Sequence, residues 1–363
     1  TPICFEIIGQ QDYCPKNYDG TFRGLTQIRF ALGNSYNIAA VKVLALNTVP
    51  EFITFARKLG ITTWDNPNNY GLSLTLGGGE VKMIDMATAF GVFANNGTKV
   101  PLHAILKIED SNGNTLKEYI PSDTAKKVVE LLNAEPVKTI KEEDPTPQKV
   151  LSYGTSFLIS HILADNQARS AAFGANSTLN IPKHTVSVKT GTTNNLRDNW
   201  TIGYTSDYLV ATWVGNNDNT PMSYVASGVT GASPIWSKIM RYLLQNTTTP
   251  GLIPPKDIIV GNLVCSDSGV PPKEDQESCS TRYEYFLKDT IHPTSSLERK
   301  DIFVNRTTRR PPENELEAQE LDLENHLVAS DPFVKDYCLT CQPREEGAPP
   351  APPTYFLYSP PKR

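Results

Sequence analysis

The 363-residue sequence has no apolar run that approaches the roughly 20 residues needed for a membrane-spanning helix. It also lacks a basic excess, because 34 Lys and Arg residues face 39 Asp and Glu residues and leave a net charge of -5. This balance excludes the electrostatic signature of a nucleic-acid-binding protein. Hydrophobic residues make up 39% of the chain, which is enough for a sizeable core in one large domain or two to three smaller ones. We therefore predict no nucleic-acid partner and no membrane-embedded segment within this sequence.

Cysteine and histidine are scarce, with six and five residues. The cysteines fall into three spaced pairs: Cys4 with Cys14, Cys265 with Cys279, and Cys338 with Cys341. An even count permits disulfides in an oxidising compartment, and six reduced thiols are the alternative. Cys338-Leu-Thr-Cys341 would be half of a zinc site, but no second Cys-x-x-Cys or His pair completes it, and His326 is isolated in the sequence. We therefore predict no metal site and no cofactor.

The most informative stretch is Val-Ser-Val-Lys-Thr-Gly-Thr-Thr-Asn-Asn at residues 186–195. It begins as a β-branched alternation that predicts a strand, and Asn-Asn turns the chain out of that strand. Two further apolar runs, 200–204 and 208–214, follow after short connections. We expect the three runs to form an antiparallel sheet with Lys189 and Thr190 on its first strand.

The residue types on this strand suit an acyl-transfer site. Lys189 would supply a fixed ammonium for a substrate carboxylate and for proton transfer, and the Thr190 hydroxyl would add a donor to the same carboxylate. Gly191 has no Cβ, so an extended acyl group could lie against the backbone like an added strand. The amide of Thr192 could face a developing oxyanion. An ordinary strand end is the alternative explanation for so short a motif.

Ser35-Tyr-Asn37 lies between two predicted helices, of which the first covers residues 22–33. The serine hydroxyl could take part in proton transfer, and the asparagine amide could hold a peptide carbonyl or amine of a substrate. Helix capping by Ser35 and Asn37 is the alternative, because Ser and Asn often cap helices.

Ser-x-Asn and Lys-Thr-Gly are two of the three motifs of penicillin-recognising serine enzymes, and Ser-x-x-Lys is the third. With both motifs in this order, the chain resembles the transpeptidase domain of penicillin-binding proteins, in particular the bifunctional class A type. The resemblance covers about residues 12–245. It is carried by seven further stretches: Asn17-Tyr-Asp-Gly20, Arg29-Phe-Ala-Leu32, Ala39-Ala-Val-Lys42, Ala172-Phe-Gly-Ala-Asn176, Asp198-Asn-Trp-Thr-Ile-Gly-Tyr204, Trp213-Val-Gly-Asn-Asn217 and Ala232-Ser-Pro-Ile-Trp236.

The resemblance implies an α/β fold of the α+β type, in which helices and a helical lobe flank an antiparallel sheet. It implies an enzyme outside the cytoplasmic membrane that cross-links peptidoglycan stem peptides through a serine acyl-enzyme and is acylated by β-lactams. Ser35 would belong to the proton relay, Asn37 would bind the substrate amide, and Lys189 would orient and tune Ser35. Thr190 would hold a carboxylate, and the Thr192 amide would complete the oxyanion hole. A glycosyltransferase domain and a membrane anchor upstream are implied in the same way.

One family motif has no counterpart at the expected place. The nucleophile and its lysine belong to Ser-x-x-Lys, which in the family precedes Ser-x-Asn. The only match here, Ser359-Pro-Pro-Lys362, follows both motifs and has two prolines where a helix must place Ser and Lys on one face. We expect the nucleophile upstream of Thr1, a fold incomplete at its N-terminus, and an isolated chain that is inactive. A D,D-carboxypeptidase or β-lactamase and a non-catalytic peptidoglycan-binding module are the alternatives.

The composition shifts after about Asn246. We expect a partial transpeptidase domain at residues 1–249 and a Pro-rich, partly disordered C-terminal extension at residues 250–363. Within the extension, Leu316, Leu323 and Leu327 stand among acidic residues and predict an exposed amphipathic helix. Residues 264–286 resemble a small extension that follows some class A domains, and on that basis we expect a Cys265–Cys279 disulfide.

Overall fold

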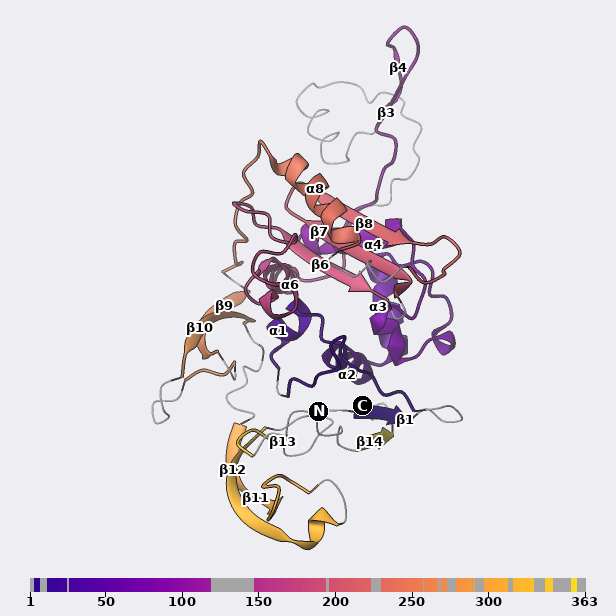
Figure 1. Cartoon of the computed structure of the whole chain (residues 1–363). Coiled ribbons are helices and arrows are strands. Elements are labelled where there is room, and N and C mark those ends of the chain that lie inside the picture. Colours follow the sequence, from indigo (N-terminus) through magenta and orange to yellow (C-terminus); the bar gives the residue numbers. More distant parts are fainter. Residues whose placement is uncertain are drawn as a thin grey trace.

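The computed structural model describes residues 3–6, 12–24, 26–118, 147–193, 196–222, 230–256, 258–266, 269–272, 279–288, 290, 297–312, 316–329, 337–341 and 354–357. Within these residues helices and antiparallel strands are mixed, and a three-stranded sheet lies among helices (Figure 1). The expectation of a mixed α/β architecture is therefore met.

The sheet consists of β6 (Ser187–Thr192), β7 (Asp198–Tyr204) and β8 (Leu209–Gly215) in the order β6–β7–β8. Both strand pairs are antiparallel, with Thr190 opposite Thr201 and Trp200 opposite Trp213. The turn between β7 and β8 is closed by the Thr205 hydroxyl, which accepts a hydrogen bond from the Tyr208 amide at 3.1 Å. The prediction of three antiparallel strands in this part of the chain is confirmed.

Helices cover both faces of this sheet (Figure 1). One face carries α8 (Ala232–Leu244), and the other carries α4 (Met83–Ala94) and α6 (Tyr153–Ala164). Gly203 makes the α8 contact possible, because a Cβ at this position would lie 2.5 Å from Cζ2 of the fully buried Trp236. On the opposite face the Tyr204 hydroxyl forms a 2.8 Å hydrogen bond with the Ser160 hydroxyl of α6.

A helical lobe adjoins the face of α4 and α6. It contains α1 (Ile28–Gly33), α2 (Asn37–Asn47), α3 (Val49–Leu59), and the short 3₁₀ helices η1 (Pro67–Asn69) and η2 (Leu72–Leu76). The first helix was expected over residues 22–33 but begins only at Ile28. Gly24 has a φ of 66°, in the left-handed region, and this conformation excludes a continuous right-handed helix from residue 22.

Two apolar cores hold these layers together. The helical lobe buries residues of α2, α3, η2 and α4, including Val41, Ile53, Leu74 and Ala89. The second core lies between the sheet and α8 and contains Val188, Val210, Trp236, Met240 and Leu244. Among the described helices, none has by itself the length and apolar composition needed to cross a bilayer. Helices α2 and α3 have the required length and composition only when taken together, and they meet at a bend of 97°.

Short elements complete the part of the chain before residue 250. They are α7 (Ser170–Phe173), the antiparallel pairs β2 (Thr98–Lys99) with β5 (Gln148–Lys149) and β3 (Lys107–Glu109) with β4 (Thr115–Glu118), and β1 (Ile3–Glu6), which pairs in parallel with β14 (Thr354–Leu357).

The C-terminal region is built from strands. The antiparallel pair β9 (Ile259–Cys265) and β10 (Thr281–Leu287) is followed by β11 (Leu297–Asn305), η4 (Glu317–Gln319), β12 (Leu321–Ala329) and β13 (Tyr337–Cys338). The prediction of an amphipathic helix through Leu323 and Leu327 is wrong. Both residues lie in β12, which pairs with β11 over its full length, so cross-strand pairing replaces the expected helix.

The strand pair β9–β10 packs against α1 and α6. Arg29 of α1 is 5% exposed and forms ion pairs with Asp165 and with Glu284 of β10. The Tyr285 ring contacts the rings of Phe157 and His161 on α6, with centroids 5.3 Å and 4.8 Å away. The predicted boundary at residue 249 stays a prediction, but β10 is in direct contact with the helices behind the sheet.

Candidate active site

The structure brings Ser35 and Lys189 into direct contact. Ser35 lies in the turn between α1 and α2 with a φ of 58°, an uncommon conformation for a residue with a side chain. The ammonium of Lys189, on β6, donates a hydrogen bond to the Ser35 hydroxyl and another, of 2.7 Å, to the carbonyl of Thr190. The two motifs found in the sequence therefore meet through their serine and lysine side chains.

Asn34 fixes the turn that carries Ser35. Its buried side chain donates hydrogen bonds to the carbonyls of Phe30 at 2.9 Å and Ala168 at 2.7 Å, and it accepts one from the Ala172 amide at 2.9 Å. Close packing supports these bonds, because a Cβ on Gly33 would lie 3.3 Å from the Ala168 backbone. The turn is thus attached to residues 168–172.

The same segment also holds the strand of Lys189. Arg169 is buried, and its guanidinium donates hydrogen bonds to the carbonyls of Leu163 at 2.7 Å and Val188 at 3.3 Å. One short segment therefore contacts both the Ser35 turn, through Ala168 and Ala172, and strand β6, through Arg169.

The surroundings of Lys189 favour its neutral form. Burial of the ammonium, assisted by the positive charge of Arg169, lowers the pKa of Lys189 from 10.5 to about 8. Burial also lowers the pKa of Arg169 to about 10, against the opposing effect of Asp165. A lysine with a pKa near 8 can exchange a proton with a neighbouring hydroxyl close to neutral pH.

Strand β6 has no strand partner on one side among the residues that the structure describes. The carbonyls of Val188 and Thr190 accept hydrogen bonds from Arg169 and Lys189, not from β7. Backbone groups of alternate residues point to the same side of an antiparallel strand, so the amide of Thr192 also faces this free edge. An unpaired strand edge of this kind can receive an extended peptide, and the Thr192 amide lies on this edge.

The other predicted site residues lie on different faces. Gly191 shares the face of Lys189 by strand alternation, and an added Cβ would lie 3.6 Å from its nearest neighbour, in Trp200. Thr190 and Thr192 stand opposite Thr201 and Asn199, on the face that carries α8. The Thr192 hydroxyl accepts a 3.1 Å hydrogen bond from Asn199, and Thr190 is buried.

Asn37 begins α2, but its side chain does not cap the helix. Its amide donates a 2.9 Å hydrogen bond to the carbonyl of Lys16. The N-cap position belongs to Tyr36 and has no side-chain hydrogen bond, so the capping alternative for Ser35 and Asn37 does not describe this turn.

Sequence reasoning missed Asn34 and Arg169. Both act through backbone carbonyls of residues distant in sequence, and no residue pattern identifies such partners.

All six cysteines are paired in the structure. The disulfides join Cys4 to Cys14, Cys265 to Cys279 and Cys338 to Cys341. The Cys265–Cys279 bond connects the end of β9 with the residues before β10, and it therefore closes the strand pair that packs on α1 and α6.

Comparisons with known proteins agree with the geometry. The model of a family described as the penicillin binding protein transpeptidase domain matches residues 16–241. Penicillin-binding protein 1A of Neisseria lactamica is 28% identical over 250 residues, which are 69% of this chain and 28% of that protein. The protein of the same name from Neisseria gonorrhoeae is 26% identical over 333 residues, covering 85% of this chain and 37% of that protein.

Solved structures show the same likeness. The crystal structure of penicillin-binding protein 1A from Haemophilus influenzae superposes with a TM-score of 0.63 at 25% identity, over 80% of this chain and 44% of that chain. PonA1 from Mycobacterium tuberculosis in complex with penicillin V superposes with a TM-score of 0.50 at 22% identity, which indicates a shared fold. The chain spans about 28% to 37% of the length of the two curated relatives named above.

Proposed function

This chain belongs to the penicillin-binding protein transpeptidase domain family, and on that premise we propose that it supplies the second and third motifs of a serine D,D-transpeptidase. The reaction would cross-link peptidoglycan stem peptides on the outer side of the cytoplasmic membrane. The observation that carries the proposal is the hydrogen bond from Lys189 to Ser35 beside the free edge of β6.

Each group has a defined part in this proposal. The stem peptide lies along β6 as an added strand, and the Thr192 amide donates to the carbonyl oxygen that becomes an oxyanion. A serine nucleophile gives its proton to the lysine of its own motif and attacks that carbonyl. The bond to the terminal D-Ala then breaks, and the departing amine takes this proton through Ser35 and Lys189. An amine from a second stem peptide then attacks the acyl-enzyme and releases the serine. Asn37 would hold the substrate amide after exchanging its bond to Lys16.

The ammonium of Lys189 lies on the side of β6 where the substrate carboxylate would arrive. The Thr190 hydroxyl faces α8, so its proposed bond to that carboxylate requires the carboxylate to reach round the strand edge or the hydroxyl to rotate.

We place the nucleophile and its lysine upstream of Thr1 in the parent protein. The only Ser-x-x-Lys in the sequence is Ser359-Pro-Pro-Lys362, which cannot form the required helical pair. A glycosyltransferase domain and a membrane anchor of the parent belong to the same proposal, as does acylation of the parent by β-lactams. PonA1, which has the same fold, has been solved in complex with penicillin V, and this supports a β-lactam as a ligand of the parent protein.

Labelling with a fluorescent penicillin tests the proposal. The full-length parent and the 363-residue chain are incubated side by side and examined by gel and mass spectrometry. We expect a labelled parent, an unlabelled chain, and a modified serine within an upstream Ser-x-x-Lys. Lys189→Ala in the parent should greatly slow labelling, whereas Lys238→Ala, at an exposed position on α8, should not.

Each other outcome contradicts part of the proposal. A parent that stays unlabelled and makes no cross-links favours a non-catalytic peptidoglycan-binding module. A labelled parent that releases product to water and not to an added amine acceptor favours a carboxypeptidase or a β-lactamase. Covalent penicillin on the 363-residue chain would show that the nucleophile lies within it.

A further inference from the structure

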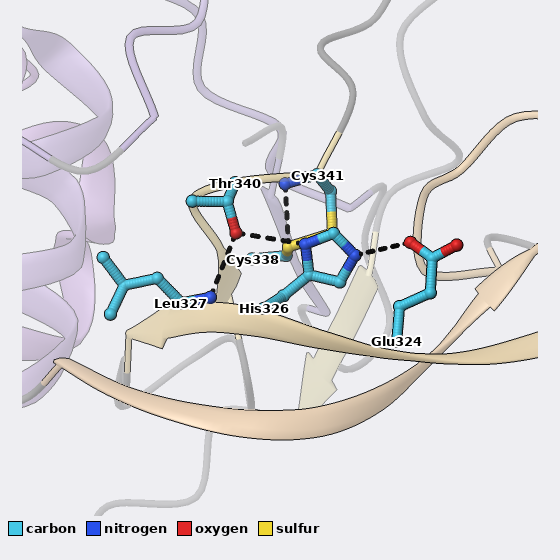
Figure 2. The surroundings of a disulfide bond; sticks show 6 residues. All are labelled: Glu324, His326, Leu327, Cys338, Thr340 and Cys341. Atoms are coloured by element: carbon cyan, nitrogen blue, oxygen red, sulfur yellow. Dashed lines mark hydrogen bonds and ion pairs between the residues drawn. A yellow bond between two sulfur atoms is a disulfide. The ribbon is translucent and has the colours of Figure 1, made fainter.

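His326 lies beside the Cys338–Cys341 disulfide, although eleven residues separate it from the first cysteine. Pairing of β12 with β13 places Val328 opposite Cys338 and brings the Cys-x-x-Cys loop over the His326 ring (Figure 2). A ring nitrogen of His326 and the two sulfur atoms all lie within 4.8 Å of one another. Two sulfur donors and one imidazole are the set that a borderline-soft cation such as Zn²⁺ prefers.

Two hydrogen bonds hold the ring of His326 in a fixed orientation. The Thr340 hydroxyl accepts a 3.0 Å hydrogen bond from the Leu327 amide, so its own proton is free to point at Nδ1 of His326, 3.0 Å away. In this tautomer Nδ1 carries the lone pair, which a metal ion can take once the Thr340 hydroxyl turns away, and Nε2 donates to the Glu324 carboxylate at 2.8 Å. A histidine that ligates a metal through one nitrogen usually donates from the other to a carboxylate in this way.

The loop is held in place by bonds other than the disulfide. The Leu339 amide donates to the Leu327 carbonyl at 2.8 Å, which attaches the loop to β12. The Cys341 amide donates to Sγ of Cys338 at 3.0 Å, a bond that also stabilises a thiolate at that sulfur. All three groups are only partly buried, so a reductant and a metal ion can reach them.

We propose that Cys338, Cys341 and His326 form a redox-controlled Zn²⁺ site. A dithiol reductant transfers two electrons and two protons to the disulfide and is itself oxidised to a disulfide. The two Cys thiols then release two protons as their sulfurs bind Zn²⁺ together with Nδ1 of His326, and water takes the fourth tetrahedral position. A disulfide oxidant removes two electrons from the thiolates, reforms the S–S bond and releases the ion. This site is independent of the transpeptidase proposal.

Zinc titration of the full chain tests the site. Protein is reduced with a phosphine, freed of reductant without oxygen, and titrated with Zn²⁺ against a chromophoric chelator; oxidised protein is treated in parallel. Reduced wild type should bind one Zn²⁺ more than a reduced Cys338→Ser/Cys341→Ser variant, and the oxidised proteins should not differ. The other four cysteines are present in both the wild type and the double serine variant, so the difference in bound Zn²⁺ comes from Cys338 and Cys341.

Single substitutions then separate the ligands from their supports. His326→Asn should abolish the additional equivalent, and Glu324→Gln should weaken it by about 10- to 100-fold. His184→Asn, which changes a histidine outside the cluster, should leave it intact. Equal zinc uptake by wild type and the double serine variant, or full affinity in His326→Asn, overturns the proposal.

Cobalt binding to reduced wild type provides a second measurement, whose negative outcome is informative without any variant. Co²⁺ in the proposed site gives strong visible absorption of a tetrahedral centre and a sulfur-to-metal charge-transfer band, and both disappear on adding Zn²⁺. Weak bands of an octahedral ion without charge transfer would overturn the proposal even if every variant proved unstable.

Discussion

Ser35 accepts a hydrogen bond from the ammonium of Lys189, a residue 154 positions away. The serine is held by a turn whose Asn34 side chain bonds to Ala168, and the lysine strand is held by Arg169. Ala168 and Arg169, which are consecutive in the chain, therefore fix the distance between the two motifs. This arrangement leads to predictions about Lys189, Arg169 and Asn34, and the contact of β10 with α1 leads to a fourth.

Replacing Lys189 with Met should change how stability depends on pH. The pKa of Lys189 is about 8 in the folded chain, whereas the ordinary value of 10.5 applies to the unfolded chain. Between these values the unfolded chain binds more protons, so the stability of the wild type rises with pH across this window. Below pH 8 the buried Lys189 is charged in the folded chain, so the full cost of burying this charge lowers the free energy of unfolding there.

Urea unfolding from pH 7 to pH 10.5 measures this effect. Relative to Lys189→Met, the free energy of unfolding of the wild type should rise by up to about 3 kcal/mol between pH 8 and pH 10.5. A Lys238→Met variant, changed at an exposed lysine, should follow the wild type throughout. Parallel curves for wild type and Lys189→Met would show that Lys189 is not desolvated.

Arg169→Leu should strongly destabilise the fold. The substitution leaves the buried carbonyls of Leu163 and Val188 without their donor and should cost about 3 to 5 kcal/mol. Arg23→Leu is the matched control, because Arg23 pairs with Asp19 at an exposed site and should contribute less than about 1 kcal/mol.

The same variant has a second readout. The positive charge of Arg169 helps to lower the pKa of Lys189, so its removal should raise the lower limit of the pH window of Lys189 and narrow the window. Denaturant unfolding of both variants over the same pH range gives both values. A loss near that of Arg23→Leu, with an unmoved window, would contradict the assigned role.

The sheet could be predicted from the sequence because its information is local. Residues 186–214 alternate and carry turn residues between apolar runs, and strands β6, β7 and β8 follow this pattern closely. The same kind of reasoning failed at β12. Leu316, Leu323 and Leu327 have a spacing that a helix also permits, and only pairing with β11 decides for a strand.

The site could be predicted only in part, for a physical reason. Ser35 and Lys189 were found because each lies in a short motif. Asn34 and Arg169 bond to backbone carbonyls, which every residue type possesses, so their partners leave no trace in the residue pattern. His326 was judged isolated for the same reason, since its neighbours Cys338 and Cys341 reach it only through the register of β12 and β13.

Asn34→Ala should loosen the turn that presents Ser35. The buried carbonyl of Ala168 loses its donor, and the amide of Ala172 keeps only its 3.3 Å bond to the Arg169 carbonyl, at a cost of about 3 kcal/mol in the free energy of unfolding. Thermal and urea unfolding measure this loss, and the rate of penicillin acylation in the parent protein should fall with it. Asn47→Ala removes an exposed asparagine that bonds within its own helix and should cost less than about 1 kcal/mol. Equal losses in the two variants would exclude a special role for Asn34.

Glu284→Gln should weaken the attachment of β10 to α1 and change the acid sensitivity of the chain. Burial raises the pKa of Glu284, but hydrogen bonds from Arg29 and Arg282 and the charge of Arg29 outweigh it and lower the pKa to about 2. The unfolded chain, with a pKa near 4.5, binds more protons between these values, so this stabilisation is present above pH 4.5 and is lost as the pH falls toward 2.

At pH 7 the free energy of unfolding of Glu284→Gln should be about 3 kcal/mol lower than that of the wild type, because the substitution leaves the buried Arg29 with one carboxylate in place of two. Between pH 4.5 and pH 2 its stability should fall less steeply than that of the wild type. Urea unfolding at a series of pH values measures both effects, and Glu298→Gln, at a side chain that is 70% exposed, is the control. If Glu284→Gln and Glu298→Gln gave the same pH profile, the ion pair of Glu284 with Arg29 would contribute nothing to the attachment of β10 to α1, and the packing of Tyr285 on α6 would be left to hold the strand.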